Sequence, residues 1–388
     1  MHGTVSGALR RGAGSAKSPG LGGEILSLWL ALLACVLSGF AAQAAAQGPA
    51  PAASAGVARQ PLRLAAAQGR LTSREIGLVI NTADPYSVAV GEHYIAARQL
   101  APEQVLRIEL PLRAQLTEEE FTRLRVAIAE RFGSRTQALA LAWRLPYAVS
   151  CNGISGALAL GFDASLCEHG CSASRPSAYF NSPTARPWTD LRLRPSMLLA
   201  AKDVESALRM IDRGVASDGT LGLRGAPPAQ AWFVTTADAA RNVRAVEFPT
   251  AGRPAPSVDV RVEPESTWPE TGPVILYLTG RVRVDRIETI PWAAGALADH
   301  LTSTGGVLDG DQQMPATAWI DAGATASYGT VSEPCNHLQK FPQPKVLLGQ
   351  YMQGVTAIEA YWKSVAWPQQ GVFVGEPLAA PFSRVVKR

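Results

Sequence analysis

The chain has 388 residues, of which 47% are hydrophobic and 18% are charged. This composition supports a folded core and excludes a chain that is disordered throughout. Lys and Arg number 36 against 32 Asp and Glu, and the net charge of +4 lacks the basic stripe of nucleic-acid-binding proteins. Five cysteines are too few for a miniprotein built on disulfides. No interior apolar run is long enough for a multi-pass membrane protein.

Residues 1–46 show the three-part pattern of a secretory signal peptide. Three basic residues precede an apolar stretch over residues 25–40, and a run of three alanines that ends at Ala46 fits a cleavage site. The stretch is short for a transmembrane helix. The residues before Cys35 loosely resemble a lipoprotein box, but the apolar run continues beyond this cysteine, so we favour simple cleavage near Ala46. We therefore expect a periplasmic or secreted protein without a stable membrane span after cleavage.

Two further regions follow the signal peptide. Residues 47–73 are rich in Ala, Pro, Gly and Gln and lack periodicity, which predicts a flexible leader. Residues 74–388 alternate short apolar runs with amphipathic stretches, so we expect them to form a single domain. Within this domain, residues 144–196 hold three cysteines and several prolines and glycines but no periodic run, which predicts an irregular insertion.

Strands and helices are predicted to alternate along this domain. The first part comprises a strand over residues 76–81, a helix from Ser87 to Leu100, a strand over 105–110, a helix behind the capping box of Thr117 and Glu120, and a strand over 138–143. The second part comprises a helix from Val204 that ends before Gly214, a strand over 231–235, a helix over 239–246, a Pro-rich surface excursion over 249–273, a strand over 274–278, a helix over 293–302, a strand over 317–320, a helix over 350–365 and a strand over 371–374. Each strand–helix–strand unit needs a crossover that places its strands in parallel. We therefore predict an α/β fold with a mostly parallel sheet and helices on both faces.

Several short motifs occur along residues 74–383. They are Asn81-Thr82-Ala83-Asp84-Pro85-Tyr86, Ala298-Asp299-His300-Leu301, Gly323-Ala324-Thr325-Ala326, Ser332-Glu333-Pro334-Cys335, Lys340-Phe341-Pro342 and Gly375-Glu376-Pro377. Together they resemble an uncharacterised family of exported bacterial proteins, found in species that carry the exosortase protein-sorting system. The resemblance implies no reaction, but it implies partners among cell-envelope sorting or exopolysaccharide components.

A second resemblance is to the gingipain branch of caspase-like cysteine peptidases. It is carried by Gly323-Ala324-Thr325-Ala326, Glu359-Ala360 and Gly375-Glu376-Pro377. It implies a caspase/gingipain-like three-layer sandwich. In that family the nucleophilic Cys follows a core strand and a His follows the previous strand. Here Thr279 and Arg144 stand after the corresponding predicted strands, which implies a displaced or lost catalytic dyad.

The four cysteines that follow the signal peptide are candidates for disulfides or for a metal site. An even number in an exported protein favours two disulfides, which we expect to pair Cys167 with Cys171 and Cys151 with Cys335. Short spacings also allow an alternative, because zinc takes four thiolate or imidazole ligands. The residues of this alternative metal site are Cys167, His169, Cys171 and His337.

A cysteine nucleophile is a further alternative. Cys335 would have to be a free thiolate activated by a nearby base. His337 lies two residues away, and in an extended segment this spacing points both side chains to the same side. His300 is the other candidate base. These three residues, Cys335, His337 and His300, are the predicted catalytic candidates.

Polar side chains at predicted element ends give candidate binding residues. In open α/β sheets the ligand crevice lies outside the carboxyl ends of the strands, so we expect Asn81, Asp84, Thr279 and Glu376 to line it together. A carboxylate pair there could bind a cation or transfer protons. The alternative is that Asp84 and Glu376 only begin turns with the prolines that follow them. The predicted binding residues are Asn81, Asp84, Asp299, Glu333 and Glu376.

No nucleotide-binding pattern accompanies these residues. A Gly-x-Gly-x-x-Gly sequence between strand and helix and a Walker sequence are both missing, so we expect no nucleotide cofactor, and we assign none of any other kind. The expected function is that of an exported accessory or binding protein linked by resemblance to exosortase-dependent sorting. The competing hypothesis is a hydrolase related to caspase-like cysteine peptidases.

Overall fold

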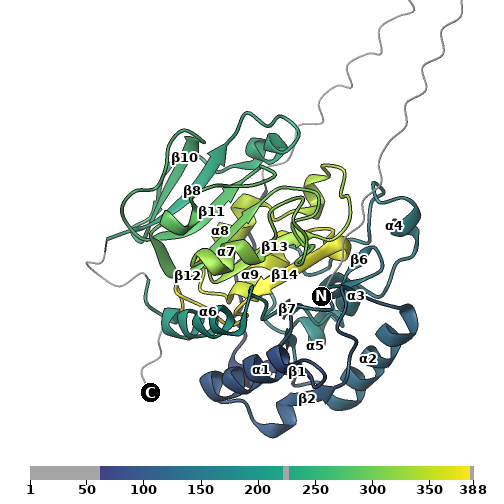
Figure 1. Cartoon of the computed structure of the whole chain (residues 1–388). Helices are drawn as coiled ribbons and strands as arrows, with labels where there is room; N and C mark the ends of the chain where they lie inside the picture. Colours follow the sequence, from purple (N-terminus) through teal and green to yellow (C-terminus); the bar gives the residue numbers. More distant parts are fainter. Residues whose placement is uncertain (1–61, 222–226, 385–388) are drawn as a thin grey trace, which may run out of the picture. The chain divides into compact units, whose positions relative to one another are not determined.

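The structure, a computed structural model, describes residues 62–221 and 227–384 (Figure 1). The predicted signal peptide and residues 47–61 of the predicted leader lie outside the described residues. Residues 62–73 are held against the domain: Ala65 N donates to Asn181 Oδ1 at 3.0 Å, and Leu71 is fully buried. For these residues the prediction of a flexible leader is wrong, because side chains of the domain bind their backbone.

An 11-stranded sheet forms the centre of the described domain. Its strand order is β2-β1-β4-β7-β14-β13-β12-β11-β8-β10-β9, and neighbouring strands are parallel except at β13–β14 and β10–β9. The strands are β1 (Ile76–Asn81), β2 (Val105–Ile108), β4 (Ala138–Leu141), β7 (Ser196–Leu198), β8 (Ala229–Thr235), β9 (Gly252–Ala255), β10 (Val258–Pro264), β11 (Val274–Thr279), β12 (Trp292–His300), β13 (Ala326–Thr330) and β14 (Gly371–Gly375).

The antiparallel pair β13–β14 divides this sheet into two halves. Strands β2, β1, β4, β7 and β14 run in one direction, whereas β13, β12, β11, β8 and β10 run in the other. The carboxyl ends of the two sets therefore lie at opposite edges of the sheet. A sheet that is parallel throughout would have gathered them at one edge.

Helices cover both faces of the sheet, which confirms the predicted mostly parallel α/β architecture (Figure 1). Residues of α9 illustrate the packing: the Trp362 ring stacks on Phe373 of β14 with centroids 4.5 Å apart. The helices are α1 (Pro85–Arg98), α2 (Glu118–Arg131), α3 (Ile154–Leu160), α4 (Ser165–Glu168), α5 (Pro187–Leu191), α6 (Val204–Ser217), α7 (Thr317–Ala322), α8 (Pro344–Met352) and α9 (Ala357–Ser364).

Local sequence explains where several of these elements begin. Thr117 caps α2 through the predicted capping box, since its side chain accepts from Glu120 N at 3.2 Å. The helix predicted to begin at Ser87 begins at Pro85, and Asp84 caps it by accepting from Tyr86 N at 3.0 Å. The Ser87 hydroxyl accepts from Asn81 N at 2.8 Å, which ties the helix to the end of β1.

Two elements have the opposite type from the one predicted. Residues 292–300 form the buried strand β12, although alanine favours helices. The small side chains leave the β12 backbone open to helices, and Tyr351 donates to Gly295 O at 2.6 Å. Residues 317–322 form the short helix α7, which Gly323 ends with a positive φ of 121°. Periodicity cannot separate a short buried helix from a short buried strand.

Other predicted boundaries change as well. Helix α6 continues past Gly214, and the predicted helix 350–365 is two helices separated at Gly354, which has a φ of 87°. The segment predicted as helix 239–246 is a 3₁₀ helix, Asn242–Glu247. The Pro-rich excursion contains β9 and β10, and the expected irregular insertion contains α3–α5 with the short strands β5 (Ala148–Val149) and β6 (Asn152–Gly153), which form a small sheet with β3 (Gln115–Leu116).

Candidate functional site

Glu376, directly after β14, is fully buried and forms ion pairs and hydrogen bonds within a cluster of three charged residues. Arg98 Nε donates to Glu376 Oε1 at 3.0 Å and Arg98 Nη2 to Oε2 at 2.6 Å, while Nη1 donates to Asp218 Oδ2 at 2.7 Å. Burial alone would lower the pKa of Arg98, but the charge and hydrogen bonds of Glu376, together with the charges of Tyr94 and Asp218, raise that pKa overall. A Cβ on Gly214 would lie 2.5 Å from Glu376 Oε2, so glycine permits this close packing of α6. We call Arg98, Asp218 and Glu376 the Glu376 cluster.

Two other predicted binding residues have structural partners at the end of β1. Asn81 Nδ2 donates to Leu110 O at 3.1 Å, and Asn81 Oδ1 accepts from Leu110 N at 2.9 Å. Asp84 is the cap of α1. The Asn81 side chain is fully buried and joins β1 to the segment after β2. Its amide groups are therefore occupied by the fold.

Asp299 lies near the carboxyl end of β12, at the opposite edge. Arg244 Nη2 approaches Asp299 Oδ1 at 2.6 Å and also donates to Thr279 O at 2.8 Å. Within the described residues, Asp299 Oδ2 and Arg244 Nε are buried without a hydrogen-bond partner. Burial raises the pKa of Asp299, and the charge of Arg244 offsets part of this effect.

His300 extends this second group. Trp319 Nε1 donates to His300 Nδ1 at 2.9 Å, so the proton of the neutral imidazole belongs on Nε2. Burial lowers the pKa of His300 to about 3, and the backbone of Met314 beside the ring offsets part of this effect. His300 is therefore neutral at physiological pH. We call Arg244, Asp299 and His300 the Asp299 cluster.

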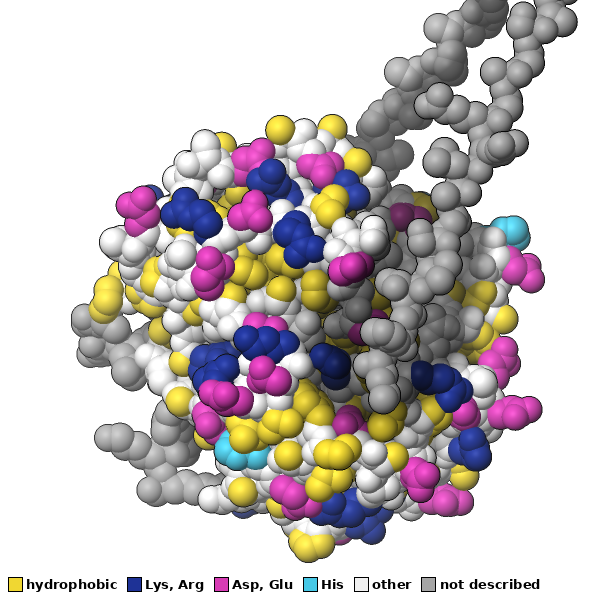
Figure 2. Space-filling model, in the orientation of Figure 1, with side chains coloured by type: hydrophobic (Ala, Val, Ile, Leu, Met, Phe, Trp, Pro, Cys, Tyr) yellow, Lys and Arg dark blue, Asp and Glu magenta, His cyan; other side chains and the backbone are white. Residues whose placement is uncertain are grey.

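Polar residues that follow β12 form a further group of hydrogen bonds with Arg241 and Gln313. Arg241 Nε donates to Thr302 Oγ1 at 3.2 Å, and Arg241 Nη1 pairs with Asp238 at 3.0 Å. Gln313 Oε1 accepts from Thr302 Oγ1 at 2.7 Å and from Thr304 N at 2.8 Å. On the face shown in Figure 2, basic and acidic side chains are interspersed, without a patch of one sign.

Two disulfides involve the insertion: one lies within it, and the other joins it to the segment after β13. They pair Cys151 with Cys167 and Cys171 with Cys335. The expected presence of disulfides is confirmed, but the predicted pairing is wrong, because residues 165–168 form the helix α4, which carries Cys167 to Cys151. Disulfides are typical of proteins that fold outside the cytoplasm.

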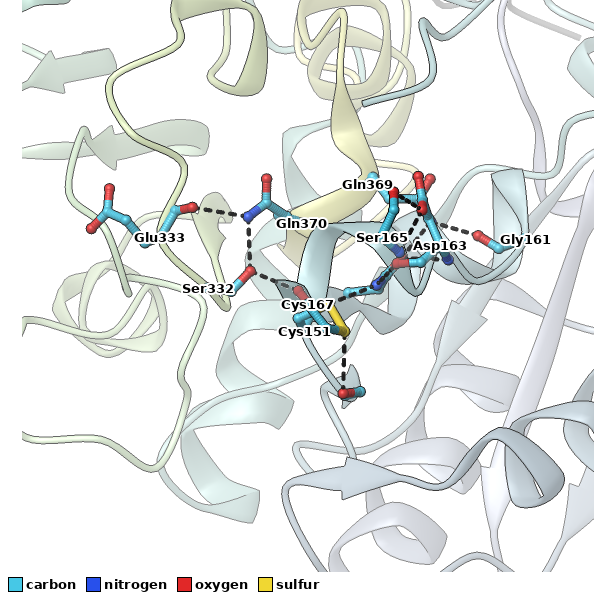
Figure 3. Close-up of a disulfide and its surroundings, with 11 residues drawn as sticks. Cys151, Gly161, Asp163, Ser165, Cys167, Ser332, Glu333, Gln369 and Gln370 are labelled. Atoms are coloured by element: carbon cyan, nitrogen blue, oxygen red, sulfur yellow. Dashed lines mark hydrogen bonds between the residues drawn. A yellow bond between two sulfur atoms is a disulfide. The ribbon is translucent and has the colours of Figure 1, made fainter. Parts of the chain in front are cut away.

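Polar side chains surround the first disulfide (Figure 3). Ser332 Oγ donates to Cys151 O at 2.7 Å and accepts from Gln370 Nε2 at 2.8 Å. Gln370 Nε2 also donates to Glu333 O at 3.0 Å, and Glu333 Oε1 accepts from Cys335 N at 2.7 Å. Glu333 therefore shapes the turn that presents Cys335 to its disulfide partner.

These contacts correct the cysteine-based alternatives. Cys335 Sγ is bonded to Cys171, so it is not a thiolate nucleophile. The His337 ring lies 2.7 Å from Cys171 O through Nε2 and packs against Trp367. Cys167 and Cys171 are both oxidised, so they are not thiolate ligands, and among the described residues no group of three metal-ligating side chains occurs. His169 is exposed on the same loop.

The reversal at β13–β14 separates the predicted binding residues. Asn81, Asp84 and Glu376 follow strands of the first half, whereas Asp299 and Glu333 stand at the ends of strands of the second half. Thr279 ends β11 and therefore lies at the edge opposite Asn81. The expectation of one shared crevice is wrong, because the sheet is not parallel throughout.

Two buried charged residues beside these sites were not among the candidates. Arg244 lies in a segment whose sequence predicts only an ordinary helix, so no pattern identified it. Lys340 Nζ donates to Gly170 O at 2.7 Å, and burial lowers its pKa to about 8. Lys340 begins the Lys-Phe-Pro motif quoted above, and this motif was the available signal.

The comparisons with other proteins give no match. No protein-family profile matches the chain, and no significant similarity to a curated protein or a solved structure was found. Within residues 62–221 and 227–384, none of the helices has the length and apolar character needed to cross a bilayer.

Proposed function

We propose that the protein is an exported binding protein without peptidase activity that serves protein sorting at the cell surface. The observation that carries this proposal is the bond between Cys335 and Cys171. It removes the thiol that the sequence predicted as a candidate nucleophile beside His337. The two disulfides support export, and the motif resemblance described above supports the sorting context.

The other acid–base candidates also support binding rather than hydrolysis. His300 and Asp299 are about 2% and 1% exposed, so a substrate has no direct access to either. A general base must come within hydrogen-bond reach of the proton it removes. In the Glu376 cluster, both carboxylate oxygens of Glu376 are already engaged by Arg98.

Alkylation of the native exported protein tests this proposal. Intact mass after iodoacetamide treatment should show no modified cysteine before reduction and four after reduction. An electrophilic peptide probe should not label the native protein. Labelling that disappears in Cys335→Ala but persists in Cys151→Ala would overturn the proposal and favour a cysteine hydrolase.

A further inference from the structure

The described N-terminal segment lies in a groove that contacts its backbone. Asn181 Nδ2 donates to Arg63 O at 2.8 Å, and Asn181 Oδ1 accepts from Ala65 N at 3.0 Å. Gln353 repeats this arrangement two residues further on: Nε2 donates to Ala65 O at 3.1 Å and Oε1 accepts from Ala67 N at 2.8 Å. Each carboxamide thus pairs with an extended backbone as a neighbouring strand would.

Two further side chains complete the groove. Gln350 Nε2 donates to Ala65 O at 3.0 Å, and Glu359 Oε2 accepts from Leu71 N at 3.0 Å. In all six of these hydrogen bonds the bound segment uses backbone atoms. Three of these bonds use backbone carbonyls, which every residue provides, and three use backbone N–H groups, which every residue except proline provides. We call Asn181, Gln350, Gln353 and Glu359 the carboxamide groove.

The groove limits the size of the side chain at some positions of the bound segment. Ala65 and Ala67 are half-buried toward the domain, whereas Leu62 and Leu64 are 46% and 41% exposed. A Cβ on Gly349 would lie 2.5 Å from Leu64 Cδ2, so the glycine leaves room for this side chain. Leu71 is fully buried and anchors the end of the segment. Small residues at two alternate positions and one apolar anchor are the side-chain requirements.

The groove has more polar capacity than its present occupant uses. Gln350 Oε1 is buried without a hydrogen-bond partner in the described residues, as are Glu359 Oε1, Lys363 Nζ and the hydroxyl of Tyr179. Lys363 Nζ lies 4.0 Å from Glu359 Oε1 and 5.3 Å from the centre of the Tyr179 ring. Glu359, Lys363 and Tyr179 interact with one another in this buried group, so Gln350 Oε1 is the atom that points to a ligand with an additional donor.

We propose that the carboxamide groove is a binding site for an extended polypeptide segment of an exported partner, and that residues 63–71 occupy it in the same chain. This inference deepens the proposed function by naming the chemistry of the partner, and it rests on the protein being a binding protein. The partner segment lies extended, has small residues at two alternate positions and needs free N–H groups at those positions. Exchange requires that the bound segment releases these six hydrogen bonds and that Leu71 leaves the core.

A labelled peptide tests the inference with the full exported chain. The peptide has the sequence of residues 62–72 and carries fluorescein, and fluorescence anisotropy measures its binding. Ala67→Pro in the chain removes the donor to Gln353, so the variant should bind the peptide at least tenfold more tightly than the natural chain. Ala66→Pro is the matched control, since Ala66 N makes no hydrogen bond in the described structure, and its affinity should be unchanged. The peptide with proline at position 67 should not bind.

A second variant helps to distinguish a loss of peptide binding from misfolding of the chain. Gln68→Pro removes the bond from Gln68 N to Pro183 O and should also strengthen peptide binding. If both variants keep the circular dichroism of the natural chain and bind no peptide, the inference is overturned. A dimer of the natural chain that the peptide dissociates would assign the groove to a second copy and overturn the assignment to a partner. The probe labelling that tests the proposed function is independent of both results.

Discussion

Each edge of the sheet buries an arginine–carboxylate pair, but the two pairs differ in how completely their polar atoms are hydrogen-bonded. In the Glu376 cluster, two parallel hydrogen bonds join Arg98 and Glu376, and Asp218 takes the remaining guanidinium nitrogen. In the Asp299 cluster, one carboxylate oxygen and Arg244 Nε have no partner within the described structure. A buried pair is stabilising only when its remaining polar atoms are satisfied.

This difference indicates that different interactions stabilise the two edges. The Glu376 cluster joins α1, the C-cap of α6 and the end of β14, and none of its side-chain polar atoms is buried without a hydrogen-bond partner in the described residues. The edge of the Asp299 cluster is less completely paired, and a disulfide holds the neighbouring segment after β13. We infer that ion pairing stabilises the first edge and that covalent bonding contributes more at the second. Substitutions in the disulfides and in the two clusters should separate these contributions.

Removing the disulfide near the second edge should have the largest effect. Cys171 and Cys335 are 164 residues apart, whereas Cys151 and Cys167 are 16 apart. The chain-entropy estimate gives a loss of about 5 kcal/mol for Cys171→Ser with Cys335→Ser, against about 3 kcal/mol for the other double variant. Urea unfolding of both variants measures the difference. Equal losses would show that loop closure does not govern the stability of this edge.

Breaking the Glu376 cluster should cost nearly as much. Glu376→Gln leaves the Arg98 guanidinium buried with only Asp218 as its counter-charge. We expect a loss of about 4 kcal/mol in the free energy of unfolding. The control is Glu205→Gln, which removes an exposed pair with Arg209 and should change stability by less than about 1 kcal/mol. Similar losses in the two variants would contradict a stabilising role for the buried cluster.

Acid should destabilise the second edge through His300. Its folded pKa of about 3 lies below its ordinary value of 6.5, so the unfolded chain takes up a proton first as the pH falls. The stabilisation is complete above pH 6.5 and is lost toward pH 3, by about 3 kcal/mol between pH 7 and pH 4.

The variant His300→Gln isolates this contribution. Subtracting its urea unfolding profile from that of the natural chain removes the effect of Asp299, whose raised pKa acts in the opposite direction. The difference should fall as the pH is lowered. His169→Gln, at an exposed position, should retain the natural profile. A flat difference between pH 7 and pH 4 would exclude a buried neutral His300.

Sequence patterns predicted the elements whose signals are local. The continuous apolar runs of β1 and β11 and the capping box of α2 gave the correct element types at nearly correct positions. Strand β12 was missed because its alanines match helix propensity, and only burial between β11 and β13 makes it a strand. Tertiary contacts override weak local preferences in such segments.

The residues of the candidate site could likewise be predicted only in part from the sequence. Asp299 and Glu376 could be chosen because they stand at predicted element ends, and both are buried. Their partners Arg244 and Arg98 come from other segments, and pairing over such distances leaves no periodic signal. The reversal at β13–β14 is also a long-range property, so the sequence could not show that the two carboxylates lie at opposite edges.

The smallest expected effect is that of Asp299→Asn, and it tests the comparison most directly. Because burial raises the pKa of Asp299, its charged form is already disfavoured, and an amide oxygen can still accept from Arg244. We expect a loss of about 2 kcal/mol, roughly half that of Glu376→Gln. Urea unfolding at pH 7 gives both values under one condition. If Asp299→Asn cost as much as Glu376→Gln, the unpaired atoms of the Asp299 cluster would not weaken its pairing, and the two edges would be equivalent.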